Sequence, residues 1–404
     1  MRARLTVLGG SSPSTLALID ALVAVGGPPS LAEVTLYGRD ADHLSAVERY
    51  ARARLTGLVP KVRSTLRLEE ALEGATLVLH QIRYGGLEGR SDDEAFAEAC
   101  GVDADETLGP SALRCALRIA PALTRLSRAL TQTCPDARVI NLVNPLSVST
   151  ALLAASGVRC LGVCELPLVT AQQAARVLGV PLASLGWAYD GLNHRGFIHD
   201  LTIEGHDQLP RLLERLGGET INGIPRDVIE ELDALPLKYF RLLLTGHRST
   251  VGRASFLMEL GAHVFRELRE SHPAAPPSLA RRDVRWYPDA VVPAIVALTS
   301  SEPRRIVVTL PRAHDVAVEV QADVCATAIE PAPGPPPKRR VSAWLDRFAR
   351  HERAVLRAVA EPEIDTLTTA LAADPLLANV DVMPWARALC SYARQEGAPS
   401  WAFA

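Results

Sequence analysis

The chain has 404 residues, of which 48% are hydrophobic and 22% are charged, a composition typical of a globular protein and not of a disordered one. The formal net charge is −3 and there is no basic run that could follow a phosphate backbone, so we expect no nucleic-acid partner. No apolar run approaches the ~20 residues needed to cross a bilayer, so we expect no membrane partner either.

The first apolar run, residues 5–8, ends at Gly9-Gly10-Ser11-Ser12-Pro13 and is too short for a signal peptide. The seven cysteines are widely spaced and form no CxxC motif, which is typical of reduced thiols and not of a disulfide framework. We therefore expect a cytoplasmic protein.

In the first part of the chain, apolar runs alternate with helical patterns. Strands are predicted over residues 4–8, 33–37, 61–66, 75–82 and 138–143, with one more ending at Cys164, and helices over residues 12–25, 40–58 and 108–133. Alternating strands and helices predict βαβ units and a parallel sheet covered by helices on both faces. We predict an α/β fold whose first domain, residues 1–166, is a Rossmann-like dinucleotide-binding domain.

From about residue 167 the pattern is mostly helical, with strands predicted over residues 304–310 and 316–320. The proline-rich segment 331–337 can be neither helix nor central strand and predicts a surface loop, followed by helices over residues 341–360 and 364–373. We predict a mixed α+β second domain, residues 167–404, for the substrate, the metal and the contacts of a homodimer or homotetramer.

Gly9, Gly10 and Ser12 lie where the first predicted strand meets the first predicted helix. Two glycines let the backbone approach a pyrophosphate, and free N–H groups at a helix start favour an anion, although an ordinary turn would look alike. The second strand ends at Gly38-Arg39, without the acidic residue that usually binds the adenosine ribose. An arginine there can accommodate a 2′-phosphate, so the expected cofactor is NAD or NADP.

Cys164 and His194 are the strongest candidate metal ligands. Cys164 follows the apolar run 158–163, and His194 closes Gly191-Leu192-Asn193-His194 thirty positions later. A thiol and an imidazole both suit a borderline-soft divalent ion, and two protein ligands leave positions open for a substrate. Taken singly, a cysteine is more often a small buried residue and a loop histidine is usually solvated.

Further segments carry a resemblance to a known family. They are Gln81 to Leu87 with Arg90, Asp93 and Glu94; Asp105 to Pro110; Arg118; Asn144-Pro145 with Thr150; Cys164 with Pro167; Gly191 to His194; Pro236 with Tyr239; Arg253; and Arg282 with Tyr287. In order, they resemble motifs of glycoside hydrolase family 4, the NAD- and metal-dependent glycosidases, and in particular its 6-phospho-β-glucosidase branch. The chain departs from that pattern at Gly38, at Glu165 in place of asparagine, at Leu242-Leu243 and at Asp283-Val284.

This resemblance implies a reaction outside the usual two-carboxylate glycoside hydrolysis. The sugar is oxidised at C3 by hydride transfer to the nicotinamide, the C2 proton then leaves, the group at C1 is expelled, water adds and the hydride returns. It implies that a divalent ion, for which we expect Mn²⁺, lies on Cys164 and His194, that Tyr239 is the base at C2, and that Glu165 protonates the leaving oxygen.

The resemblance also implies binding residues for a small glycoside, with or without a 6-phosphate. Asn144 and Asn193 would hold sugar hydroxyls, Asn144 would also contact the cofactor, and an anionic group would meet Arg83, Arg90, Arg253 and Arg282. Arg90 with Asp93 and Glu94 could instead form a charged helix face, and Tyr239 could be a core residue.

Two other functions stay open. One is an NAD(P)-dependent 2-hydroxy acid dehydrogenase, because lactate and malate dehydrogenases have the same two-lobed architecture. The other is a non-catalytic descendant that binds a nucleotide or a sugar, which the departures at Gly38 and at Leu242-Leu243 favour.

Overall fold

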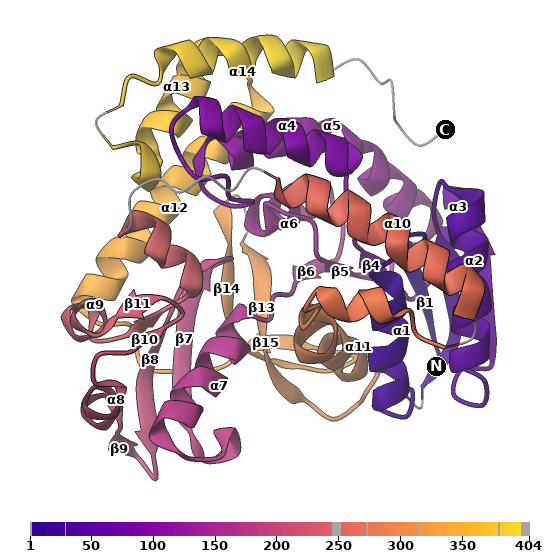
Figure 1. Ribbon diagram of the computed structural model, residues 1–404, viewed down its shortest axis with the longest axis horizontal. Coiled ribbons are helices and arrows are strands. Elements are labelled where there is room, and N and C mark those ends of the chain that lie inside the picture. Colours follow the sequence, from indigo (N-terminus) through magenta and orange to yellow (C-terminus); the bar gives the residue numbers. More distant parts are fainter. Residues whose placement is uncertain are drawn as a thin grey trace.

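A computed structural model describes residues 2–28, 30–244, 252–271, 274–312, 315–378 and 380–396 (Figure 1). Its main sheet contains the strands β1 (Ala3–Leu8), β2 (Leu31–Tyr37), β3 (Lys61–Thr65), β4 (Leu77–His80), β5 (Arg138–Asn141), β6 (Cys160–Gly162), β7 (Gly186–Leu192), β8 (Arg195–Ile203), β9 (His206–Asp207), β12 (Leu235–Pro236), β13 (Arg304–Arg312), β14 (Asp315–Val324) and β15 (Ile329–Pro331). A separate small ribbon pairs β10 (Thr220–Ile221) with β11 (Ile224–Pro225).

The helices of the described residues are α1 (Thr15–Ala24), α2 (Ala41–Arg54), α3 (Leu68–Leu72), α4 (Gly86–Ala99), α5 (Gly109–Thr133), α6 (Leu146–Ala155), α7 (Leu166–Leu178), α8 (Leu209–Leu216), α9 (Arg226–Leu232), α10 (Arg253–Ser271), α11 (Val292–Leu298), α12 (Arg339–Ala360), α13 (Ile364–Ala373) and α14 (Met383–Glu396). None of these helices combines the length and the apolar character that crossing a membrane requires.

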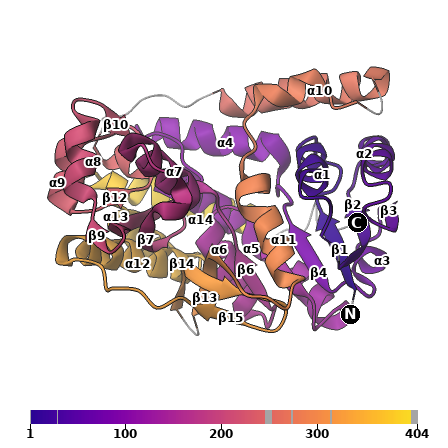
Figure 2. The same cartoon turned by 90° about the horizontal axis from the view of Figure 1, so that it is seen from below.

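The first six strands form a parallel sheet in the order β3-β2-β1-β4-β5-β6, which is the Rossmann order. Buried residues of α1 and α2 pack on one face and those of α3 and α5 on the other, as expected for strands that are apolar on both faces (Figure 2). The predicted α/β class with a Rossmann-like first half is therefore confirmed.

Several predicted bounds differ from the observed ones. The first helix begins at Thr15 and not at residue 12, because Ser12 and Ser14 belong to the turn before it. The second helix begins at Ala41, where the side chain of Asp40 accepts a hydrogen bond from the His43 amide, and it ends at Arg54.

The second part of the chain contains more strand than its pattern predicts. β7 and β8 form a long antiparallel hairpin, and β14 pairs with β7 on one side and with β13 on the other. β13 in turn pairs with β6, so the sheet crosses the predicted domain boundary between residues 166 and 167 without a break. That boundary stays a prediction.

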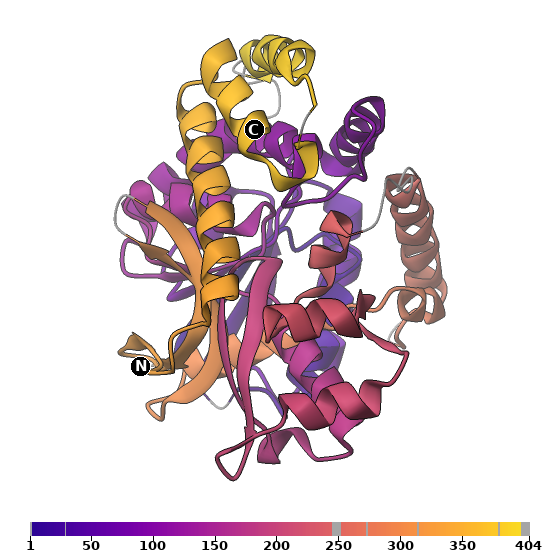
Figure 3. The same ribbon diagram turned by 90° about the vertical axis from the view of Figure 1, so that its left-hand side faces the viewer.

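The C-terminal helices tie the two parts together. α12 runs along β7, β8 and β14, and α13 and α14 pack on α5 of the first half (Figures 1 and 3). α10 lies along α4 and reaches α2, where the ring of Phe265 stacks on His43 with 3.7 Å between centroids (Figure 2).

Candidate active site

One cavity of about 990 Å³ lies at the carboxyl ends of the parallel strands. The chain leaves β4, β5 and β6 at this edge, which brings Arg83, Asn144 and Cys164 together although they are far apart in sequence. The predicted site residues that line it are Gly9, Ser12, Arg39, Arg83, Arg90, Asn144, Cys164, Glu165, Asn193, His194, Tyr239, Arg253 and Arg282.

Gly10 does not line the cavity. Its N–H and that of Gly9 both donate to the carbonyl oxygen of Tyr37, at 2.6 and 3.0 Å, so neither amide is free for a phosphate as the sequence led us to expect. A Cβ atom on Gly10 would lie 2.9 Å from that of Leu36, which shows that Gly10 serves close packing against β2. Anion contacts at this turn would fall to Ser11, Ser12 and Ser14, which do line the cavity.

The end of β2 leaves no room for an acidic side chain. A Cβ atom on Gly38 would lie 2.5 Å from Oγ of Ser11, so the ribose-binding carboxylate of other Rossmann domains cannot be placed there. Arg39 is exposed at the rim of the same cavity. The local structure thus replaces a carboxylate by a guanidinium, which suits a phosphate.

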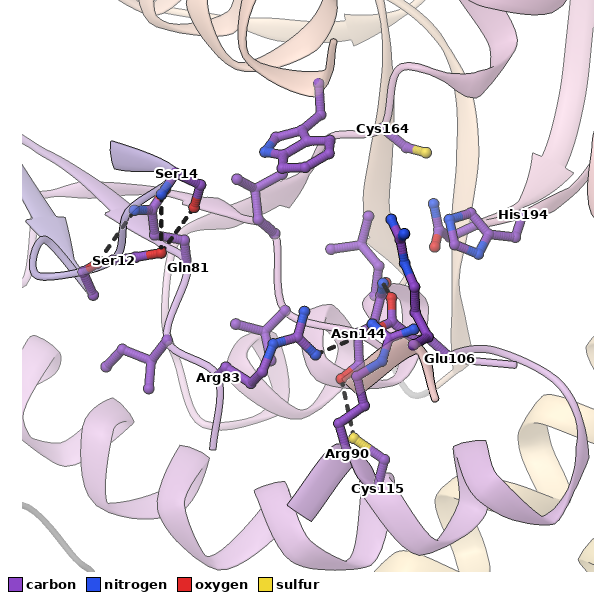
Figure 4. A pocket seen from close by; sticks show the side chains of 18 of the residues that line it. Ser12, Ser14, Gln81, Arg83, Arg90, Glu106, Cys115, Asn144, Cys164 and His194 are labelled. Atoms are coloured by element: carbon purple, nitrogen blue, oxygen red, sulfur yellow. Dashed lines mark hydrogen bonds and ion pairs between the residues drawn. The ribbon is translucent and has the colours of Figure 1, made fainter. Parts of the chain in front are cut away.

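Cys164 and His194 come from different parts of the sheet and meet at this cavity. Cys164 lies between β6 and α7, and His194 lies in the two-residue turn between β7 and β8 (Figure 4). Both are buried, with 8% of each residue exposed. Asn193, the neighbour of His194 in this turn, is among the groups that lower the pKa of the Cys164 thiol, so its side chain lies near the sulfur.

The surroundings of His194 leave one ring nitrogen for a metal. Nδ1 lies 2.8 Å from Oγ1 of Thr107, and burial lowers the pKa of the ring to about 3, so the imidazole is neutral. When Nδ1–H donates to Thr107, Nε2 carries the lone pair that a metal needs.

The thiol of Cys164 fits a cation as its partner. Burial, followed by the charges of Glu165 and Glu319, raises the pKa of Cys164, so the thiolate needs a positive charge beside it. Among the described residues there is no cluster of three or more His, Cys, Asp or Glu side chains that could enclose a metal. Cys164 and His194 therefore fit an open site, in which a substrate supplies further ligands.

Tyr239 stacks on the candidate metal ligand. Its ring centroid lies 4.4 Å from that of His194, and the ammonium of Lys238 lies 4.9 Å from the tyrosine ring. Burial, and then the charges of Asp105 and Glu106, raise the pKa of Tyr239, so a cation must offset these effects before the phenol can act as a base.

The pKa of Glu165 is shifted in the direction that suits a general acid. Burial raises the pKa of its carboxyl, and Lys238 lowers it in part. Its Oε2 lies 3.7 Å from the sulfur of Cys164, so a proton on Glu165 would be held beside the metal pair.

Glu106 lies in the segment Asp105 to Pro110 that carries part of the resemblance, but the sequence alone assigned it no role. Its carboxylate accepts hydrogen bonds from Arg83 at 3.1 Å, from Arg90 at 2.5 Å and from Asn144 at 2.8 Å (Figure 4). Burial opposes its ionisation, but the charges of Arg90 and Arg83 outweigh burial and lower its pKa. Arg90 also forms an ion pair with Glu94 at 2.8 Å, one turn further along α4. This pair agrees with the alternative in which Arg90 belongs to a charged face of a helix.

Arg282 lines the cavity and forms no ion pair with the described residues. Its guanidinium lies 4.8 Å from the ring centroid of Trp286, and its buried Nε has no hydrogen-bond partner among the described residues. Burial and the neighbouring Arg83 lower its pKa to about 10, which still leaves it charged near neutral pH. Arg253 begins α10 and is exposed at the rim.

Two more contacts shape the cavity. The hydroxyl of Tyr287 donates to Gln81 at 2.9 Å, and Gln81 donates to Oγ1 of Thr15 at 3.0 Å, which fixes the wall beside the nucleotide turn. Oδ1 of Asn193 is buried and has no hydrogen-bond partner in the described part of the chain.

Comparisons with known proteins identify the family. The model for "Family 4 glycosyl hydrolase" matches residues 4–180, and the model for its C-terminal domain matches residues 189–377. The "Probable 6-phospho-beta-glucosidase" of Bacillus subtilis is 24% identical over 93% of this chain and 92% of its own length. The "6-phospho-beta-glucosidase BglT" of Thermotoga maritima is 28% identical over 53% of this chain and 51% of its own.

Solved structures agree with this fold. A 6-phospho-beta glucosidase from Thermotoga maritima, solved with manganese, NAD⁺ and glucose-6-phosphate, superposes with a TM-score of 0.86, 22% identity and 98% of each chain covered. Malate dehydrogenase from Plasmodium falciparum superposes with a TM-score of 0.51, 12% identity and coverage of 89% of this chain and 99% of its own. The resemblance read from the sequence is confirmed: the chain belongs to glycosyl hydrolase family 4.

Proposed function

We propose that this chain is a 6-phospho-β-glucosidase-like glycosidase that works with NAD or NADP and a divalent ion, Mn²⁺ being the expected one. One observation carries the proposal: Cys164, His194 and the stacked Tyr239 face the same cavity as the nucleotide turn at Gly9. A metal pair, a candidate base and a dinucleotide fold at one cavity are the parts that oxidation followed by elimination needs.

The substrate class is supported by the relatives and by the arginines. Relatives from Bacillus subtilis, Thermotoga maritima and Escherichia coli carry the name 6-phospho-beta-glucosidase. Arg282, which lines the cavity, stays charged near neutral pH and forms no ion pair with the described residues, is the first candidate for the 6-phosphate, with Arg253 at the rim. Arg83 and Arg90 already neutralise Glu106, so we assign them to positioning that carboxylate.

Each residue role follows from its surroundings. When bound, NAD(P) would accept the hydride from C3 and the divalent ion would polarise the C2 and C3 oxygens. Tyr239 would take the proton from C2, Glu165 would give its proton to the leaving oxygen at C1, and Asn144 and Asn193 would hold sugar hydroxyls. Cys164 and His194 would hold the ion through sulfur and Nε2.

The test is proton exchange at C2. Hydrolysis of a nitrophenyl 6-phospho-β-glucoside in heavy water, with Mn²⁺ and either nucleotide, should place deuterium at C2 of the released sugar. Tyr239→Phe should lose around 10²-fold or more in turnover, the scale of a general base, and still bind the metal. Cys164→Ser should lose both the metal and the metal-dependent activity.

Other outcomes separate the alternatives. Hydrolysis without exchange at C2 would mean direct displacement and would contradict the proposed reaction. Nucleotide binding without turnover of any glycoside, phosphorylated or not, would favour the non-catalytic descendant, and oxidation of a 2-hydroxy acid without metal would favour a dehydrogenase. A homodimer or homotetramer and a cytoplasmic location stay predictions, the first of which light scattering on the purified protein would test.

A further inference from the structure

The turn that carries His194 is held in an unfavourable backbone conformation. His194 has φ of 65°, in the left-handed region that residues other than glycine rarely adopt. Such a conformation persists only where surrounding contacts fix it, and it often marks a functional site. The question is which contacts fix this turn.

Glu319 lies directly behind the turn. It is fully buried on β14, opposite Gly191 of β7, and it accepts hydrogen bonds from the Tyr189 hydroxyl at 2.5 Å and from Nδ2 of Asn193 at 3.2 Å. Thr309 of β13 donates to the same carboxylate at 3.3 Å. Glu319 thus joins three strands to the residue beside His194.

Two glycines make this arrangement possible. A Cβ atom on Gly196 would lie 1.9 Å from the Tyr189 hydroxyl, and one on Gly191 would lie 2.8 Å from it. The Tyr189 phenol therefore occupies space that a side chain at position 191 or 196 would fill. Gly191 and Gly196 pair with each other on the two sides of the Asn193-His194 turn. The same two glycines thus border the turn and make room for the hydrogen bond from Tyr189 to Glu319.

Glu319 is a costly residue to bury. Among the described residues, no Arg, Lys or His side chain forms an ion pair with it, and burial raises its pKa despite the bonds from Tyr189 and Asn193. Burying a carboxyl group without a cation beside it destabilises a fold. We therefore expect Glu319 to have a role other than filling space in the core. Asn193, which donates to Glu319, lines the same cavity as Cys164 and His194, whereas Glu319 is not among the residues that line it.

We propose that Tyr189 and Glu319 are positioning residues of the metal site, which hold Asn193 so that His194 faces the cation and the Asn193 amide meets the Cys164 sulfur. This inference rests on the proposed metal site. Neither residue touches the substrate or the metal; both act through the turn, as the outer contacts of a metal ligand commonly do.

Cobalt binding tests it. Co²⁺ bound by a thiolate gives a sulfur-to-metal charge-transfer band, which reports the Cys164 bond without any turnover. Tyr189→Phe and Glu319→Ala should weaken Co²⁺ binding by about 10- to 100-fold and shift or weaken that band. Glu319→Gln keeps one acceptor oxygen and should be affected less than Glu319→Ala. The dissociation constant for the nucleotide should change little in all three.

Tyr50→Phe is the matched control. Tyr50 is also buried and also donates to a carboxylate, at 2.7 Å to Asp20, but it lies outside the residues that line the cavity. Both phenylalanine variants should lose thermal stability by a similar amount, and only Tyr189→Phe should lose cobalt affinity.

The outcomes are distinguishable. Cobalt affinity in Tyr189→Phe within twofold of the wild type, with an unchanged band, overturns the inference, and so does an equal loss of affinity in Tyr50→Phe. If Glu319→Ala does not fold, Tyr189→Phe still decides, because it removes a single hydroxyl. A wild type without a thiolate band overturns the proposed metal site as well.

Discussion

Glu106 determines how much free positive charge the cavity offers. Arg83 and Arg90 both form ion pairs with its carboxylate, and Arg90 forms a second ion pair with Glu94. Arg282 stacks on Trp286 and keeps a buried N–H without a partner in the described residues. Beside Glu106, a substrate anion would therefore meet arginines whose charge is already neutralised, whereas Arg282 and the exposed Arg253 would offer theirs.

Arg39 should decide nucleotide preference. An acidic side chain at position 38 would collide with Ser11, and Arg39 at the rim forms no ion pair with the described residues, so Arg39→Ala should weaken NADP binding by about 10-fold or more, the scale of a charge-assisted hydrogen bond, and change NAD binding little. Titration of both nucleotides by calorimetry measures this. A preference for NAD that is the same in wild type and variant would contradict it.

His80 should make the fold sensitive to acid. It is fully buried between Asn141 and Tyr84, and burial lowers its pKa from 6.5 to about 4. The unfolded chain binds a proton below pH 6.5 that the folded chain refuses until about pH 4, so this contribution to stability is present above pH 6.5 and is lost as the pH falls towards 4. Between pH 7 and pH 5 the loss should be about 2 kcal/mol.

Urea unfolding of the wild type and of His80→Gln at pH 7 and pH 5 isolates this effect. The difference in unfolding free energy between the two proteins should shrink by that amount at the lower pH. A constant difference would mean that His80 does not titrate as the structure implies.

At the scale of elements, the hairpin of β7 and β8 carries the site. Its candidate metal ligand and the neighbouring Asn193 were predicted from the sequence, because Gly191 to His194 matches a motif, but the two strands were not predicted. Their residues, Gly186 to Leu192 and Arg195 to Ile203, mix glycine and charge with apolar positions, so they show no clean alternation. Pairing with β14 and burial against α7 and α12 stabilise them, and these are contacts between distant segments.

Gly196→Ala should damage this hairpin. The new methyl group would overlap the Tyr189 hydroxyl, so either the phenol or the strand must move, which should cost about 2 kcal/mol or more of unfolding free energy. Gly218→Ala is the control, because Gly218 is exposed and has no atom within 4 Å of the new Cβ position. Equal stability of the two variants in urea would show that the hairpin tolerates the displacement.

At the scale of the whole molecule, a buried polar chain connects the site to the C-terminal helices. Arg195, which follows His194, pairs with Glu352 of α12, and His351 pairs with Asp374 at 3.2 Å. Asp374 in turn accepts the amide of Gly109 at 2.7 Å, at the start of α5. α12 thus connects the metal-site hairpin to the first half of the chain (Figure 3).

Glu352→Gln should reveal this connection. It leaves the buried guanidinium of Arg195 without its partner charge, which typically costs about 3–5 kcal/mol. Asp323→Asn breaks an exposed pair with Arg305 and should cost about 1 kcal/mol or less. Chemical denaturation of both variants measures the contrast, and similar losses would contradict the account of a buried network.

The structural features that could be predicted from the sequence depend on contacts between residues close in the chain, and those that could not depend on contacts between distant residues. The first six strands were predictable because they alternate with helical patterns and most of them are short apolar runs, β3 with its sequence KVRST being the exception. The pairing of Glu106 with Arg83 and Arg90, and that of Glu319 with Tyr189, join segments that only the folded chain brings together. Carboxylates of this kind have no spacing signal, so only the three-dimensional arrangement reveals them.

The unbroken sheet also restricts how a ligand can enter. Thr309 of β13 pairs with Gly162 of β6, and the space between them is so small that a Cβ atom on Gly162 would lie 2.9 Å from Thr309. The wall with the candidate nucleotide turn and the wall with the candidate metal ligands are therefore parts of one continuous sheet, which opposes a hinge motion between them. We therefore expect ligands to enter and leave through the segments around the mouth of the cavity, where Arg39 and Arg253 lie. The sheet itself would hold a bound nucleotide and a bound sugar at a constant distance.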